Sequence, residues 1–498
     1  MNLSKSKYTA LWRCPRLVWL GKYMPEEEEV SAAVEERMAA GAALGALARG
    51  IFGEYLDVSA TDGRGEPDVP AMIERTRAAI AAGVPVICEA AFSFDGLYCA
   101  VDILKREGDG YAIYEVKSST DASKEIYAAD VAYQLYVLRG AGVRVTGTHL
   151  ISVRRDYVRR GEIKPEELLT VNNIDAEVSA QYAVIEDRLK TASSILTSDV
   201  EPAIDLSVSC NTPYPCSFFG HCTAHLPCPS VFDVYRLRFS DKLALYYDGV
   251  RSFEDLHGCK RIKNDKQRRQ IATHLGLEGD HIDKPAITRF LSGLSYPLYF
   301  LDFETMQSVI PPYDGTHPYQ QIPFQYSLHY LLVEGGELYH TDFLGEPEYD
   351  PRRPLAEALC RDIPADACVT AYNKSFECGR LTELAEAFPD LSAHLLSIRD
   401  NIVELLTPFQ SGYYYTGAMG GSFSIKSVLP ALYPDCPELD YHSLEGVHNG
   451  SEAMALFPTL AELSGEDRAR ARHNLLKYCE LDTLAMVRVY EKLLAAVR

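Results

Sequence analysis

Two carboxylates and a lysine stand on extended segments that flank a turn signal at residues 108–110. Pairing these segments as a hairpin places Asp102 opposite Glu115, to within one register step. Glu115 and Lys117 are two residues apart, so their side chains project from the same face of a strand. Carboxylates can bind a hard divalent cation such as Mg²⁺ or Mn²⁺, and an ammonium offsets charge that develops on reacting oxygens. The three residues therefore predict metal-dependent phosphodiester hydrolysis, although a Glu-x-Lys pair on a strand is also a common surface ion pair.

The spacing of these residues resembles that of the PD-(D/E)XK nucleases. Gln134 lies on the predicted helix after the second strand, where RecB-like members of that family carry a glutamine motif. Two positions depart from the family pattern, because Leu138 replaces a tyrosine and Gly45 replaces a metal-binding histidine. These departures leave an inactive centre open as an alternative.

A second acidic constellation occurs in the C-terminal half of the chain. Asp302 and Glu304 are two apart near the end of the apolar strand LYFLDFET, so their side chains share one face. Tyr478 and Asp482 are four apart on a predicted helix and also share a face. Glu377 stands in the first turn of a helix that follows a strand. Each pair alone is a common surface pattern, but four carboxylates together can hold two cations about 4 Å apart.

The order of these motifs resembles the DnaQ-like exonucleases of the RNase H-like fold, in the class that carries a tyrosine (DEDDy). The resemblance implies 3′–5′ exonuclease activity. It also implies that Asp302, Glu304, Glu377 and Asp482 bind the metal ions and that Tyr478 positions the attacking water. The family has aspartate where this chain has Glu377, which makes that ligand one methylene longer.

A cysteine-rich loop suggests a further metal site. Cys210, Cys216 and Cys222 are evenly spaced, Cys228 follows at the same interval, and four such thiols could hold zinc. The segment around Cys14, SKSKYTALWRCPRLVWL, resembles the opening of RecB-like nucleases, in which one N-terminal and three C-terminal cysteines hold a 4Fe–4S cluster. Four thiolates suit either metal. The resemblance favours the iron–sulfur cluster, with Cys228 as the spare thiol.

The length of 498 residues favours two domains, and alternating helix and strand patterns predict an α/β fold class. Five stretches carry a wider resemblance: YEVKSST at 114–120, VAYQLYVL at 131–138, YFLDFETM at 299–306, GSFSIKSVLP at 421–430 and YCELDTLAM at 478–486. Through them, over nearly its whole length, the chain resembles a bacterial family that fuses a RecB-like nuclease to an RNase H-like exonuclease. The expected domains are a restriction-endonuclease-like domain at 1–230, a helical connector at 231–292 and the exonuclease domain at 293–498.

The formal net charge of −21 argues against a protein that coats nucleic acid through bulk electrostatics, but it does not argue against a nuclease, whose substrate groove can be locally basic. The sequence contains no signal-peptide pattern and no long apolar run, so we expect a cytoplasmic protein without a membrane partner. The expected partner is nucleic acid, DNA more than RNA, with protein partners unidentified. DNA repair and defence against foreign DNA both suit this activity. The alternative is a nucleic-acid-binding or scaffold protein in which one or both nuclease centres are inactive.

Overall fold

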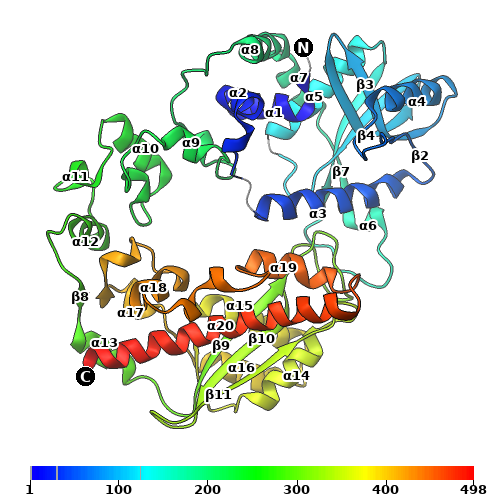
Figure 1. Ribbon diagram of the computed structural model, residues 1–498. Coiled ribbons are helices and arrows are strands. Elements are labelled where there is room, and N and C mark those ends of the chain that lie inside the picture. The colour runs from blue at the N-terminus through cyan, green and yellow to red at the C-terminus, as the bar shows by residue number, and fades with distance from the viewer. Residues whose placement is uncertain (1–2, 30–31, 124) are drawn as a thin grey trace. The chain divides into compact units, whose positions relative to one another are not determined.

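The computed structural model describes residues 3–29, 32–123 and 125–498, and it has the predicted mixed α/β character (Figure 1). The chain forms two compact units. Unit 1 comprises Met1–Ala224 and Ser308–Gln320, and unit 2 comprises His225–Gln307 and Gln321–Arg498. The segment expected to be a separate connector, 231–292, therefore groups with unit 2. The short segment 308–320 groups with unit 1, although the sequence placed it in the second domain.

Unit 1 is built on a seven-stranded mixed sheet with the order β2-β3-β4-β5-β6-β7, to which β1 adds by pairing with β4. The strands are β1 (Leu3–Ser4), β2 (Leu56–Asp57), β3 (Val86–Phe94), β4 (Leu97–Glu107), β5 (Gly110–Val116), β6 (Val145–Val153) and β7 (Leu169–Asn173). In the central hairpin Ile103 lies opposite Tyr114, which is the predicted register that puts Asp102 opposite Glu115.

Helices cover both faces of this sheet. Helix α5, which carries Gln134, is buried along most of its length. On its far side α5 packs against α1 and α7, and the buried core between helices and sheet includes Tyr8, Tyr133 and Leu138. The stretch 175–197 is divided into two helices, α7 and α8. The helices are α1 (Lys5–Arg13), α2 (Pro15–Tyr23), α3 (Ala32–Ala48), α4 (Val69–Ala81), α5 (Glu125–Gly140), α6 (Pro165–Leu168), α7 (Asp175–Tyr182), α8 (Ile185–Thr197) and α9 (Phe219–Thr223).

Unit 2 contains a five-stranded sheet with the order β11-β10-β9-β12-β13. The strands are β9 (Leu298–Met306), β10 (Ile322–Leu331), β11 (Leu338–Leu344), β12 (Cys368–Ala371) and β13 (Ile402–Glu404). β10 runs antiparallel to both β9 and β11, whereas β12 is parallel to β9 and β13. Strands β9 and β12 were predicted from the sequence, and β10 and β11 were not.

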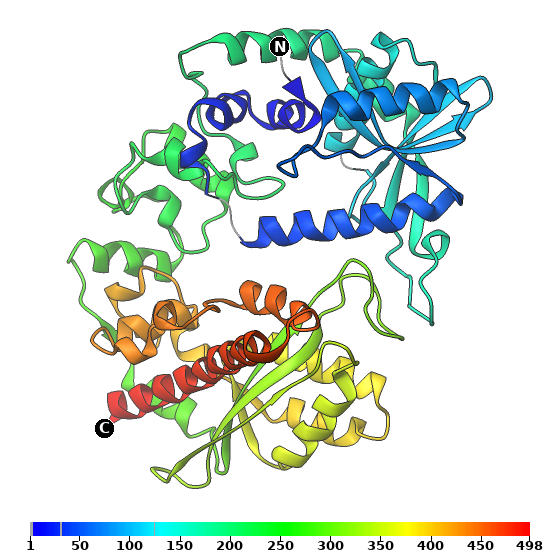
Figure 2. The same ribbon diagram turned by 45° about the vertical axis from the view of Figure 1, so that its right-hand side comes forward.

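The long helix α20 (Gly465–Val497) lies along β9, β10 and β11, while α14, α15 and α16 cover the other side of this sheet (Figures 1 and 2). The predicted C-terminal helix is therefore confirmed. The other helices of unit 2 are α10 (Phe239–Tyr247), α11 (Phe253–Leu256), α12 (Asp265–His274), α13 (Lys284–Leu291), α14 (Arg352–Asp362), α15 (Lys374–Ala387), α16 (Ser392–Asp400), α17 (Thr407–Gln410), α18 (Ile425–Leu432) and α19 (Gly450–Thr459). A small ribbon pairs β8 (His281–Ile282) with β14 (Tyr414–Tyr415).

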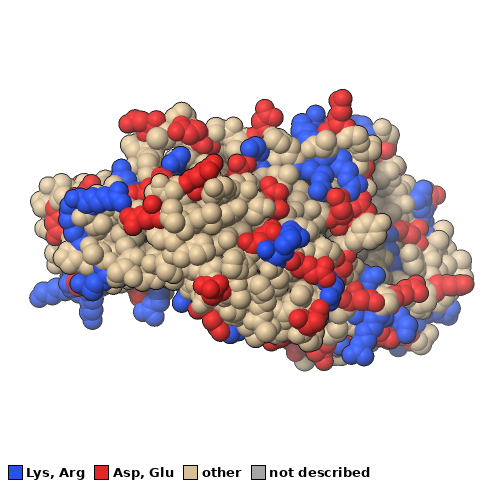
Figure 3. Space-filling view, turned by 90° about the horizontal axis from the view of Figure 1, so that it is seen from below, with Lys and Arg blue, Asp and Glu red and all other residues tan. Residues whose placement is uncertain are grey.

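Charged side chains of both signs are interspersed among other residues on the face drawn in Figure 3. In the part of the chain that the structure describes, no helix combines the length and apolar character needed to cross a bilayer.

Candidate metal centres

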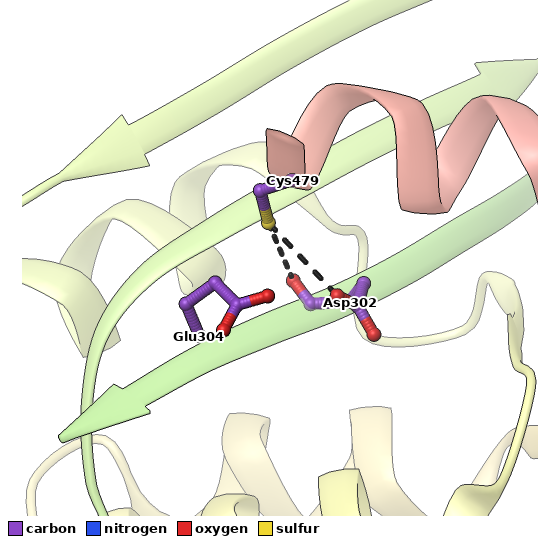
Figure 4. Close-up of side chains that lie close together, drawn as sticks. All are labelled: Asp302, Glu304 and Cys479. Atoms are coloured by element: carbon purple, nitrogen blue, oxygen red, sulfur yellow. Dashed lines mark hydrogen bonds between the residues drawn. The ribbon is translucent and has the colours of Figure 1, made fainter. Parts of the chain in front are cut away.

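Strand β9 positions two carboxylates of unit 2. Asp302 is half-buried and Glu304 is buried, and the thiol of Cys479 on α20 faces them (Figure 4). Cys479 Sγ lies 3.9 Å from the backbone oxygen of Asp302 and 4.0 Å from its Oδ2. One ligand atom from each of the three residues lies within 4.8 Å of the other two. The sequence predicted the two carboxylates on one face, but no motif in it pointed to Cys479.

Helix α20 brings Asp482 to the same group. Its carboxylate is buried, and Oδ1 accepts a hydrogen bond of 2.7 Å from the hydroxyl of Tyr441. Burial raises the pKa of Asp482 to about 6, although the hydrogen bond from Tyr441 opposes this rise. The buried position therefore disfavours the charged carboxylate.

The carboxylates also repel one another. Burial raises the pKa of Asp302 well above its ordinary value, and the charges of Asp482, Glu304 and Glu377 raise it further. Burial raises the pKa of Glu304 in the same way, with Asp482 adding to it. Lys426 acts in the opposite direction on these carboxyl groups. One lysine cannot neutralise this much negative charge, so the donor set fits divalent cations.

Glu377 lies in the first turn of α15, as predicted, and is buried. Among the described residues its Oε2 has no hydrogen-bond partner. Burial raises its pKa to about 7, and nearby Glu404 adds to this effect. Because a buried carboxylate oxygen without a partner is costly, Glu377 has the free ligand atom that a cation would use.

Tyr478 lies one residue before Cys479 and is buried, with Lys426 Nζ donating to its hydroxyl oxygen at 3.1 Å. Burial raises the pKa of Tyr478 far above its ordinary value, and Asp482 adds to this effect, so it remains a neutral phenol. Lys426 Nζ also donates to the backbone oxygen of His448 at 3.1 Å. Sequence reasoning named neither Lys426 nor Tyr441. The only signal was that Lys426 lies in the stretch GSFSIKSVLP, which carries part of the family resemblance.

The unit 1 centre has a different charge balance. Glu115 on β5 is 1% exposed, and its Oε1 accepts hydrogen bonds from Lys117 Nζ at 2.6 Å and from Lys5 Nζ at 2.8 Å. Its Oε2 accepts a bond of 2.7 Å from Gln134 Nε2. Lys117 also pairs with buried Asp130 at 2.7 Å. The structure thus brings Glu115, Lys117 and Gln134 together and adds Lys5 and Asp130, which the sequence did not indicate.

Asp102 lies beside this group on β4 and accepts a bond of 2.7 Å from the backbone N–H of Val116. Burial raises the pKa of Asp102 to about 7, and the charge of Glu115 contributes. Burial also acts to raise the pKa of Glu115, but Lys117 and Lys5 outweigh it and hold that pKa well below its ordinary value. Asp102 therefore offers an under-neutralised carboxylate, whereas both oxygens of Glu115 already have N–H donors.

Three other positions bear on this centre. Glu89 on β3, a further acidic residue that precedes the strand of Asp102, pairs with Arg49 at 3.0 Å. Leu138 is fully buried in the core of unit 1. A side chain at Gly45 would meet no atom within 4 Å.

The four cysteines singled out in unit 1 lie near one another. Cys14 separates α1 from α2, and the backbone N–H of Cys216 donates to the oxygen of Cys210 at 2.9 Å. Burial raises the pKa of the Cys222 thiol to about 11, and Cys216, Cys210 and Cys14 all add to that rise. Cys228 is exposed and falls in unit 2.

Apolar and polar contacts hold the two cysteine-bearing segments together. Trp19, Leu20 and Phe218 form a buried cluster against Cys216 and Cys222. Arg13 Nε donates to the backbone oxygen of Ser209 at 3.0 Å. The N-terminal helices therefore pack on the loop that supplies the three later cysteines.

Residues 299–424 match a protein family described as a domain of unknown function (DUF2779). An uncharacterized protein of Ureaplasma parvum serovar 3 is 27% identical over 237 residues, which cover 42% of this chain and 32% of the relative. An uncharacterized protein of Mycoplasma pneumoniae is 28% identical over 211 residues, which cover 38% of this chain and 31% of the relative. The matched part of the chain thus spans about a third of each curated relative. No solved structure matches the chain.

Proposed function

We propose that this protein is a metal-dependent nuclease that hydrolyses phosphodiester bonds of nucleic acid, DNA more than RNA. Unit 2 is the 3′–5′ exonuclease centre, and unit 1 is a RecB-like nuclease centre. The observation that carries the proposal is the group formed by Asp302, Glu304, Glu377 and Asp482. Burial raises the pKa of all four carboxyl groups, and neighbouring carboxylates raise the pKa of Asp302 and Glu304 further. A bound divalent cation would favour the ionised form of these carboxyl groups and offset their mutual repulsion.

In unit 2 these four carboxylates would hold Mg²⁺ or Mn²⁺, which supplies Lewis-acid polarisation of the phosphate and lowers the pKa of water. Tyr478, as a neutral phenol, can donate a hydrogen bond that orients the attacking water but cannot act as a base near neutral pH. Lys426 fixes the hydroxyl oxygen of Tyr478. Tyr441 orients the carboxylate of Asp482.

The fold of each unit is part of the proposal. In unit 2 a mixed sheet with one long helix along it and shorter helices behind supports an RNase H-like fold of the DEDDy class. In unit 1 the hairpin that aligns Asp102 with Glu115 supports a PD-(D/E)XK, restriction-endonuclease-like fold.

The cysteines of unit 1 support a 4Fe–4S cluster held by Cys14, Cys210, Cys216 and Cys222. The charges of Cys14, Cys210 and Cys216 all act on the Cys222 thiol, so the four side chains are near enough to share one metal centre. Four thiolates suit a 4Fe–4S cluster, and the resemblance of the segment around Cys14 to the opening of RecB-like nucleases favours it over zinc.

A hollow of about 620 Å³ lies beside the segment that follows Lys117. Its lining residues include Thr120 and Thr170, the exposed arginines Arg154 and Arg155, and Asp121, which accepts a hydrogen bond from Ser123. Arginine and hydroxyl donors are the groups that bind backbone phosphates, so this hollow supports a nucleic-acid substrate for unit 1.

A second candidate function has one observation in its favour. Both oxygens of Glu115 are already hydrogen-bonded within the protein, as expected for a unit 1 centre that binds nucleic acid without cutting it. Single-stranded and duplex DNA and RNA, labelled at either end, test both functions. The proposal requires degradation with Mg²⁺ or Mn²⁺ that stops on addition of EDTA. Binding of these substrates without degradation by either unit would favour the scaffold function.

A further inference from the structure

Lys5 reaches the unit 1 centre from the very start of the described chain. The preceding strand β1 pairs with β4, and Leu3 lies opposite Leu97. The hydroxyl of Tyr133 donates to the backbone oxygen of Leu3, and the Tyr133 ring stacks on Tyr8 with centroids 5.0 Å apart. Ser4 then caps α1, whose first residue is Lys5. The position of the lysine is thus fixed by backbone pairing and buried rings.

The two lysines of this centre share one carboxylate oxygen, Glu115 Oε1. Lys117 also forms a short ion pair of 2.7 Å with Asp130, whereas Lys5 lies 3.9 Å from that residue. The Lys5 side chain is 24% exposed and Glu115 only 1%, so the Lys5 ammonium can withdraw into water while the carboxylate cannot. The Lys5 ammonium is therefore bound to the carboxylates of this centre less tightly than the Lys117 ammonium is.

An ammonium at hydrogen-bonding distance from a carboxylate oxygen occupies the place of a cation bound to that oxygen, and the two positive charges repel each other. We propose that Lys5 is a built-in competitor of the divalent cation at Glu115, so that the unit 1 centre loads metal only when the Lys5 ammonium leaves. This inference rests on the proposed nuclease function of unit 1 and adds a control over its metal loading. Removing the charge of Lys5 should therefore tighten metal binding.

The test measures Mn²⁺ binding to the full-length protein by titration calorimetry in an Asp302→Asn, Asp482→Asn background. Binding that disappears when Glu115→Gln is added is assigned to unit 1. We expect Lys5→Gln to strengthen this binding by about tenfold, since loss of one nearby positive charge is worth on the order of 1.4 kcal/mol. Lys5→Arg keeps the charge and should bind Mn²⁺ as weakly as the parent.

Lys7→Gln is the matched control, because Lys7 is an exposed lysine on the same helix and its loss changes the net charge equally. It should leave Mn²⁺ binding unchanged. A purely structural role for Lys5 predicts the opposite sign, since a disordered centre would bind metal less tightly. Unchanged or weaker binding in Lys5→Gln overturns the inference and leaves the nuclease proposal standing. Absence of Glu115-dependent binding in every variant overturns both this inference and the metal dependence of unit 1.

Discussion

The hydroxyl of Tyr441 donates a hydrogen bond of 2.7 Å to Oδ1 of Asp482, from a turn 41 residues earlier in the chain. Both side chains are buried. The bond opposes the rise that burial causes in the pKa of Asp482. Tyr441 therefore helps to keep a proposed metal ligand ionised and correctly turned.

Tyr441→Phe removes this hydrogen bond, so the pKa of Asp482 should rise above about 6. More of the carboxylate is then protonated at pH 6 than at pH 8. We expect the exonuclease rate to fall about tenfold at pH 6 and less at pH 8. Rates with Mn²⁺ at both pH values test this, with exposed Tyr349→Phe as the control. Equal losses at the two pH values would contradict the role given to Tyr441.

The metal-free protein should lose stability as the pH rises. The pKa values of Asp482 and Glu377 are raised to about 6 and about 7, whereas unfolded carboxyl groups titrate near pH 4. Between these values the folded state binds more protons than the unfolded state, so the free energy of unfolding decreases with pH. In EDTA the melting temperature of unit 2 should fall from pH 4.5 to 8 more steeply in wild type than in Asp302→Asn. Mg²⁺ should remove the difference, and a steeper fall in the variant would refute the charge argument.

Much of the candidate site could be predicted because its residues are paired at the spacing of a strand or a helix. Asp302 and Glu304 alternate on one strand, and Tyr478 and Asp482 recur on one helix face, so spacing alone put each pair together. The hairpin register that aligns Asp102 with Glu115 followed from counting across a turn.

The site residues that the sequence did not indicate lie far along the chain from their partners, so no helix or strand spacing relates them. Lys5 lies 110 residues from Glu115, and Lys426 lies 52 residues from Tyr478. Strand β10 is buried along almost its whole length, so it lacks the alternation that identifies a half-buried strand. Segment 308–320 belongs to unit 1. Its contacts there include a hydrogen bond of 2.8 Å from the Tyr319 hydroxyl to the backbone oxygen of Ser118. No local sequence pattern predicts such a contact.

If the four cysteines of unit 1 hold an iron–sulfur cluster, the purified protein should be coloured. Protein purified without oxygen should be brown and contain iron and sulfide, because thiolate-to-iron charge transfer absorbs visible light and zinc gives no colour. Cys216→Ser should bleach it and lower the melting temperature of unit 1. Cys228→Ser should stay brown, since Cys228 lies outside the group of four. Stoichiometric zinc without iron would reject the assignment.

Cutting by unit 1 should depend on Glu115 and Lys117. In a protein whose unit 2 is disabled, Glu115→Gln and Lys117→Ala should each abolish cleavage. Lys117→Ala should also destabilise unit 1 by about 3 kcal/mol, because it leaves buried Glu115 and Asp130 with one cation fewer. Cleavage of end-labelled DNA and thermal unfolding check the two effects. Undiminished cleavage in both variants would show that this centre does not cut.

The exonuclease function of unit 2 is tested most sharply by digestion of a 5′-labelled single strand at saturating Mn²⁺, in a background carrying Lys117→Ala. Asp302→Asn and Asp482→Asn each remove a proposed cation ligand and should lower the rate on the order of a thousandfold. Tyr478→Phe should be milder because it removes only a hydroxyl, and Glu491→Gln, an exposed change on the same helix, should have no effect. We expect the parent protein to shorten the strand progressively from its 3′ end and Asp302→Asn to abolish this shortening. If Asp302→Asn shortens the strand as fast as the parent protein, unit 2 is not the proposed exonuclease.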